Sequence, residues 1–73
     1  MKASERVTAI ANRMMERSGD EQNASVEYKG NEIMATACLG SSRALLAMAK
    51  ILRVTAAQLR IEEETEQESS HGN

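Results

Sequence analysis

Polar and apolar residues alternate along residues 24–39, on both sides of the pair Gly30-Asn31. Glycine tolerates a positive φ at the first central position of a two-residue loop, so this pattern predicts a β-hairpin that turns at the pair. Successive side chains of a strand point to opposite faces, and the predicted register therefore gathers apolar groups on one face. That face holds Val26, Tyr28, Ile33, Ala35, Ala37 and Leu39. The opposite face is polar, with Lys29 facing Glu32 as a cross-strand ion pair.

A first helix is predicted ahead of the hairpin, from Ser4 as its N-cap to about Ser18. Apolar residues recur in this segment at three- and four-residue spacing, which places them on one face of a helix. They are Ala3, Val7, Ile10, Ala11 and Met14. Gly19 suits the left-handed conformation just past a helix end, so the helix is expected to stop there.

A second helix is predicted over residues 43–61, because this segment is rich in Ala and Leu and contains no Gly or Pro. A serine of the preceding Gly40-Ser41-Ser42 is expected to be its N-cap. Apolar residues of the segment form a broad arc on one side of the helix. They are Ala44, Leu45, Met48, Ile51, Leu52, Ala56 and Leu59. We expect this arc to cover the apolar face of the β-hairpin.

The predicted order is α-β-β-α, a two-layer α+β fold in which one antiparallel hairpin packs against two helices. This single domain is expected to span residues 1–61. Residues 62–73 contain five glutamates and no Lys or Arg, and their hydrophobicity is low. Such a segment cannot bury enough apolar surface to offset its ordering entropy, so we expect a disordered acidic tail.

A chain of 73 residues forms one domain at most, and its core is expected to be thin. The single cysteine excludes an internal disulfide, and one cysteine with one histidine makes no zinc site. Tyr28 is the only aromatic residue. Packing a helix face or a sheet edge against a second copy would add buried apolar area, so we expect a homodimer.

Positive charge collects on one side of the second predicted helix. Its four cations fall within about 100° of arc, on the side away from the apolar arc. They are Arg43, Lys50, Arg53 and Arg60. A stripe of this kind can follow the phosphate backbone of a nucleic acid. It is also the composition of an ordinary solvated helix face, and the segment has no aromatic residue for stacking on bases.

Aliphatic residues interrupt the same polar side of that helix, outside the arc that one hairpin can cover. Apolar groups at the surface, ringed by charge, are typical of protein interfaces. The sequence therefore predicts a partner-binding surface for a second copy or for an unidentified protein. Its residues are Leu46, Arg53, Val54 and Ile61.

No catalytic or cofactor-binding arrangement is predicted. Cys38 has no histidine near it in the expected fold, so nothing would convert its thiol to a thiolate. Glu27 and Glu32 lie on either side of the predicted turn and are expected to form surface ion pairs. Residues 40–43 lack the glycines and the lysine of a phosphate-binding loop. We therefore expect a protein that is not an enzyme and uses no cofactor.

No run of the sequence approaches the roughly 18 apolar residues of a membrane span, and the N-terminus lacks the apolar segment of a signal peptide. A single reduced cysteine fits the cytoplasm. The sequence thus predicts a small accessory or regulatory module that acts as a homodimer through the outer face of its second helix. It is also compatible with an accessory protein of a phage or mobile element. A nucleic-acid-binding regulator that uses the four cations is the alternative.

Overall fold

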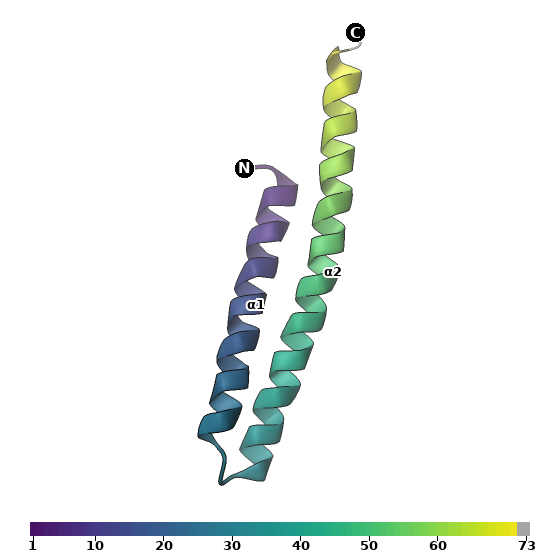
Figure 1. The fold of residues 1–73 in the computed structure, drawn as a ribbon. Coiled ribbons are helices and arrows are strands. Elements are labelled where there is room, and N and C mark those ends of the chain that lie inside the picture. Colours follow the sequence, from purple (N-terminus) through teal and green to yellow (C-terminus); the bar gives the residue numbers. More distant parts are fainter. Residues whose placement is uncertain (72–73) are drawn as a thin grey trace.

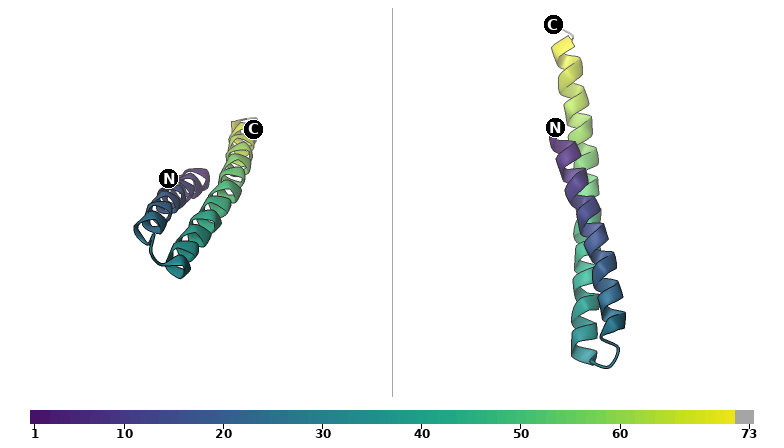
Figure 2. Two further views of the ribbon diagram at one scale, coloured as in Figure 1. Left: turned by 60° about the horizontal axis from the view of Figure 1, so that its bottom comes forward. Right: turned by 90° about the vertical axis from the view of Figure 1, so that its left-hand side faces the viewer.

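The chain folds into two long helices joined by a short turn (Figure 1). The computed structural model describes the backbone of residues 1–71 and the side chains of residues 1–67. Helix α1 spans Ala3–Glu27 and helix α2 spans Glu32–His71. The helices lie side by side and antiparallel, and α2 continues well past the start of α1 (Figure 2). The hairpin is a thin rod with extents of 65 × 16 × 9 Å.

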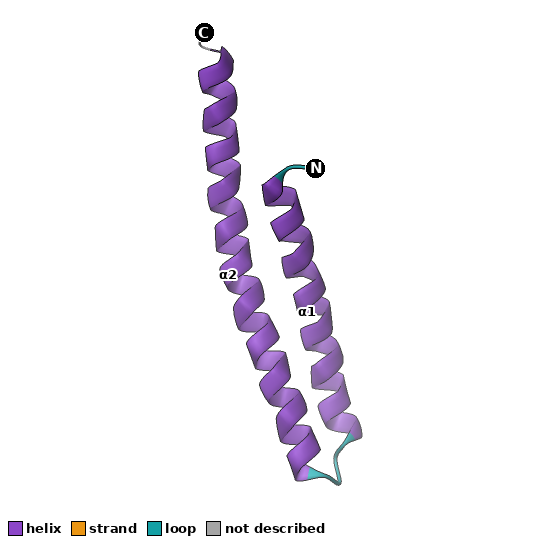
Figure 3. Cartoon of the chain, turned by 180° about the vertical axis from the view of Figure 1, so that it is seen from behind, coloured by secondary structure: helices purple, strands orange, loops and turns teal. Residues whose placement is uncertain are grey.

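The predicted β-hairpin and the α+β fold class are wrong. Residues 1–71 contain helix and turn but no strand (Figure 3). The chain does reverse at the predicted place, since residues 28–31 lie between the two helices. The reversal joins helices instead of strands, and the fold is a helical hairpin.

A seven-residue repeat of small side chains explains why residues 24–39 are helical. One line consists of Ser4, Ala11, Ser18 and Ser25, and the other of Ala35, Ser42, Ala49 and Ala56. Seven residues are close to two helical turns, so each set forms a continuous line along its helix. Both lines run through the segment that alternates with period two. Pairing these lines buries a seam along almost the whole of α1, whereas a lone two-stranded hairpin is only marginally stable.

The two lines face each other and form the centre of the contact between α1 and α2. Ser4, Ala11 and Ser18 are buried on α1, and Cys38, Ser42, Ala49 and Ala56 are buried on α2. Larger residues, half-buried, flank them: Val7 and Met14 on α1, and Leu45, Leu52 and Leu59 on α2. We call this contact the inner seam. Among the described side chains none that is large is fully buried, so the core consists of small residues that let the helices approach closely.

Asn31 begins α2 as its N-cap. Its side-chain Oδ1 accepts a hydrogen bond from the N–H of Met34 at 3.2 Å, and its carbonyl oxygen accepts one from Ala35 at 2.9 Å. The N–H of Asn31 itself donates to the carbonyl of Tyr28 at 2.8 Å, which closes the turn. The backbone of Asn31 thus closes the turn while its side chain caps α2, and no glycine in the described chain adopts a positive φ.

Both helices are longer than predicted. Gly19 lies inside α1, which continues to Glu27, and Ser41 and Ser42 lie inside α2. The helix predicted over residues 43–61 is confirmed as the middle of α2. Beyond it, α2 remains helical through the acidic residues where an unstructured tail was expected. The last two positions of that expected tail, 72 and 73, lie outside the described residues.

Candidate interaction surface on the second helix

Helix α2 carries a second line of apolar and small residues on the side opposite the inner seam. Its members are Ile33, Ala37, Gly40, Ala44, Ala47, Ile51, Val54, Gln58 and Ile61. Their spacing alternates between four and three residues, which is the spacing of a coiled-coil contact. At 100° per residue the line lies about 160° around α2 from the inner seam. We call it the outer seam.

The outer seam is exposed in the single chain. Its four large aliphatic residues, Ile33, Ile51, Val54 and Ile61, are 81, 65, 70 and 65% exposed. The small residues between them and Gln58 are exposed as well. No member carries a charge. A line of this length that is uncharged, and polar only at Gln58, is typical of a surface that binds another protein.

The outward side of α1 has a different character. Apart from the exposed Ile10, Met15 and Val26, its residues on this side are mostly polar or charged: Glu5, Arg6, Arg13, Glu16, Asp20 and Asn23. Helix α1 is therefore amphipathic in the usual way, with one contact side and one solvent side. Helix α2 has apolar residues on both sides, which is typical of a helix that lies between two neighbours.

The predicted partner-binding residues divide between two sides of α2. Val54 and Ile61 belong to the outer seam. Leu46 is half-buried, and Arg53 lies towards α1, where its Nη2 is 3.4 Å from Oδ1 of Asn12. Two of the four residues thus lie on the side that α1 leaves open, and the other two lie nearer α1.

Sequence reasoning missed most of the outer seam because it assigned the residues to other elements. Ile33 and Ala37 were placed in strands and Gly40 at a helix start. The apolar arc that was to cover the β-hairpin also divides, since Leu45, Leu52, Ala56 and Leu59 face α1 while Ala44, Met48 and Ile51 are exposed. The signal that identifies the seam is its four-three spacing, which is unbroken from Ile33 to Ile61.

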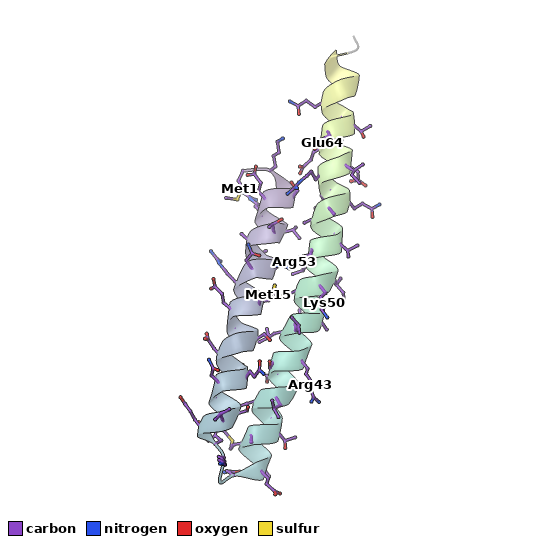
Figure 4. All side chains as sticks on the ribbon, in the orientation of Figure 1. Met1, Met15, Arg43, Lys50, Arg53 and Glu64 are labelled. Carbon is purple, nitrogen blue, oxygen red and sulfur yellow. The ribbon has the colours of Figure 1, made fainter. Side chains whose placement is uncertain are left out.

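The four predicted cations lie on neighbouring lines of α2 and are all exposed. Arg43 and Lys50 lie on one line, away from α1, while Arg53 lies on the next line towards α1 (Figure 4). Arg60 follows Arg53 by seven residues and therefore lies on the same line. No carboxylate occurs in the sequence between Arg43 and Arg60. The cations therefore form a stripe about 25 Å long, at a rise of 1.5 Å per residue. We call it the basic stripe.

A carboxylate of α2 holds the start of α1. The N–H of Ser4 donates to Oε1 of Glu63 at 3.0 Å, and its hydroxyl donates to Oε2 at 2.7 Å. These hydrogen bonds, with the nearby positive charges of Lys2 and Arg60, lower the pKa of Glu63. Lys2, the N-cap residue, makes no side-chain cap bond. Ser4 is thus inside α1 and not its cap, and Glu63 supplies the acceptor that the helix end needs.

Cys38 lies on the inner seam, facing α1. Burial raises the pKa of its thiol, and so does the nearby carboxylate of Glu21, whose negative charge disfavours the thiolate. A thiol of this kind is a poor nucleophile at neutral pH. Across the described residues, no three His, Cys, Asp or Glu side chains gather where they could hold a metal ion. Neither helix, as far as His71, has an apolar stretch long enough to cross a membrane.

Comparison of the chain with protein families, with curated proteins and with solved structures finds no match. The outer seam and the basic stripe are therefore interpreted from their own geometry and chemistry.

Proposed function

We propose that this protein is a non-enzymatic accessory or regulatory module that acts as a homodimer through the outer seam of α2. The observation that carries the proposal is the seam itself. It is an uncharged line with coiled-coil spacing, exposed in the single chain, on the side of α2 that α1 does not cover. Helices associate through lines of this kind because burying them removes apolar surface from water.

The thin core of the hairpin supports association. Its buried apolar residues are Ala11, Cys38, Ala49 and Ala56. Domains of this size are usually stabilised further by disulfides, a metal or oligomerisation. Full burial of a large aliphatic side chain contributes about 1.5–3 kcal/mol, and the outer seam offers four such residues on each copy. Pairing of two copies would therefore bury apolar side chains of α2 that α1 leaves exposed.

The polar contacts between the helices favour binding over catalysis. Ser4 and Glu63 complete a helix end, and Ser18 and Ser42 bond to each other across the inner seam. The raised pKa of Cys38 makes this thiol a poor candidate for covalent chemistry. A cytoplasmic location belongs to the same proposal, since a single unpaired cysteine suits a reducing compartment.

Two valines provide a matched test. Val54 on the outer seam is 70% exposed and Val26 on α1, off both seams, is 69% exposed. We expect Val54→Glu to shift the protein from dimer to monomer in light scattering coupled to size exclusion. It should also lower the thermal midpoint by several degrees, since the charge enters a buried contact. Val26→Glu should leave both properties nearly unchanged.

A wild-type protein that is monomeric at all accessible concentrations would refute the homodimer. Equal effects of Val54→Glu and Val26→Glu on a dimeric protein would refute the outer seam as its contact.

The basic stripe supports a second candidate function, a regulator that binds nucleic acid. Its specific observation is that the four cations lie on two neighbouring lines of α2 with no carboxylate between them in the sequence. We expect binding of a short DNA duplex at low salt, with affinity falling steeply as salt rises. Lys50→Gln should reduce the slope of log K against log salt by about 0.9, while Arg13→Gln on the far side of α1 should not. No binding at low salt would remove this candidate.

A further inference from the structure

The residues in the first half of the outer seam are smaller than those in its second half. Between its two end isoleucines, the first half holds Ala37, Gly40, Ala44 and Ala47. The second half holds Ile51, Val54 and Gln58. The seam is therefore hollow towards the turn of the hairpin and raised towards the C-terminal half of α2.

We propose that two copies pair through the outer seam with their α2 helices antiparallel, about a two-fold axis at Ala47. This inference rests on the homodimer proposed above and names its arrangement. An antiparallel register centred on Ala47 sets Gly40 level with Val54 of the other copy and places Ala44 within one residue of the level of Ile51. Isoleucines meet at both ends in either direction of pairing, but only the antiparallel register combines a small residue with a large one in these inner layers, as close packing favours.

A parallel pair would not combine small residues with large ones. It would set each residue against its own copy, with Gly40 on Gly40 and Val54 on Val54. Successive layers of small residues would leave a gap over the first half, while the large residues of the second half held the helices apart. Voids forfeit contacts and bulky layers add strain, and both disfavour the parallel pair.

The seam supplies part of the area that a stable pair needs. From Ile33 to Ile61 the seam is about 42 Å long at the rise of an α-helix, and a helix is about 10 Å wide. The seam alone therefore covers on the order of 400 Å² of each copy, against about 800 Å² per partner in specific interfaces. The two copies of Met48 meet beside the axis and extend the apolar contact on that flank.

The other flank carries charge. In the antiparallel register Arg43 lies on the same flank as Lys50 of the other copy and within one residue of its level, and the two-fold axis repeats this pair. Like charges at an exposed contact oppose association and are screened by salt. The arrangement therefore predicts a dimer that tightens as salt rises, and that also tightens when Lys50 loses its charge.

Single-cysteine variants in a Cys38→Ser background test the direction of pairing. We expect Gly40→Cys and Val54→Cys to form little disulfide alone and to form a mixed disulfide when combined. Thiols held together by the dimer react at effective concentrations on the order of mM instead of the µM of free chains. Ala47→Cys, at the axis, should bond to its own copy, and Val26→Cys on α1 should form no disulfide dimer. Circular dichroism checks that each variant keeps its helices.

The outcomes separate this inference from the homodimer itself. Disulfides of Gly40→Cys with itself and of Val54→Cys with itself would show a parallel pair and overturn the arrangement while the dimer stands. A monomeric protein without disulfides would overturn both. As an independent check, Lys50→Gln should tighten the dimer roughly two- to fivefold at low salt, and Arg13→Gln should not. A Lys50→Gln dimer that weakens would contradict the antiparallel register.

Discussion

Ser18 and Ser42 exchange hydrogen bonds across the middle of the hairpin. The hydroxyl of Ser18 donates to the carbonyl oxygen of Ser42 at 2.9 Å, and the hydroxyl of Ser42 donates to the carbonyl oxygen of Ser18 at 2.9 Å. The two hydroxyl oxygens lie 3.0 Å apart, and both residues are buried. Because each side chain reaches the backbone of the other helix, α1 and α2 must be in close contact here. This pair fixes the register of the inner seam.

Small size matters more than polarity at this pair. Ser18→Ala leaves the hydroxyl of Ser42 with its acceptor, the carbonyl of residue 18, so no buried polar group is orphaned. We expect a loss of about 1 kcal/mol or less in the free energy of unfolding. Ser18→Leu places a large side chain where the helices touch and should cost more, about 1–3 kcal/mol. Urea unfolding of the two variants measures both, and equal costs would contradict close packing at this position.

The contact between Glu63 and Ser4 predicts a loss of stability in acid. The folded pKa of Glu63 lies below its ordinary value of 4.5, so the group stabilises the fold fully above that value. The contribution is lost as the pH falls through the folded pKa, because protonation removes the charge that accepts both bonds from Ser4. We expect hydrogen exchange at the Ser4 amide to lose protection as the pH falls below the ordinary pKa of 4.5, after correction for intrinsic rates.

Glu63→Gln is the control for this prediction. It keeps the size of the side chain and removes the titration, so its Ser4 amide should be weakly protected at every pH. Glu16→Gln, at an exposed position of α1, should retain the wild-type pH profile. A wild-type profile in Glu63→Gln would show that another group causes the acid effect.

Two helical glycines are expected to respond differently to substitution. Gly19 and Gly40 both lie inside helices, and a Cβ added at either meets no atom within 4 Å in the single chain. Gly19→Ala should therefore stabilise the hairpin by about 1 kcal/mol through helix propensity. Leucine has a similar propensity, so Gly19→Leu should also stabilise it. Gly40→Leu adds bulk to the outer seam and should weaken the antiparallel dimer, which sedimentation measures. Equal dimer affinity in the two leucine variants would contradict the proposed pairing.

The sequence predicted the helical parts that have a strong pattern. Residues 43–61 and the first helix up to Ser18 are confirmed, and the chain reverses where Gly30-Asn31 stands. The prediction of strands was wrong because two patterns fit Ile33, Ala35 and Ala37. They have the period of two of a strand, and they also fit one helix that has Ala35 on its inner seam and Ile33 and Ala37 on its outer seam. Over so few residues the two periods cannot be separated. The longer line from Ala35 to Ala56 distinguishes a helix from a strand. Residues seven apart share one side of a helix, whereas in a strand they point to opposite faces.

Glycine caused the second error. The sequence predicts helix boundaries at Gly19 and Gly40, yet an exposed glycine inside a helix costs only about 1 kcal/mol. Helices of 25 and 40 residues that pack along their length tolerate this cost. Because the predicted boundaries were wrong, Ile33, Ala37 and Gly40 were separated from Val54 and Ile61, with which they form one line along α2. Local propensity was thus sufficient for the middle of α2, whereas the outer seam required the length of the whole helix.

The thiol of Cys38 should react slowly and respond to a neighbouring charge. Burial is the main cause of its raised pKa, and the carboxylate of Glu21 adds to it, so little thiolate is present at neutral pH. Glu21→Gln removes the repulsion of the thiolate but leaves the burial. We therefore expect labelling by a thiol reagent at pH 8 to accelerate in this variant and its pH profile to move to lower pH. The profile should still lie above that of the unfolded chain, since burial persists. Glu16→Gln, on the solvent side of α1, should label at the wild-type rate, and an equal acceleration there would show that Glu21 does not act on Cys38 directly.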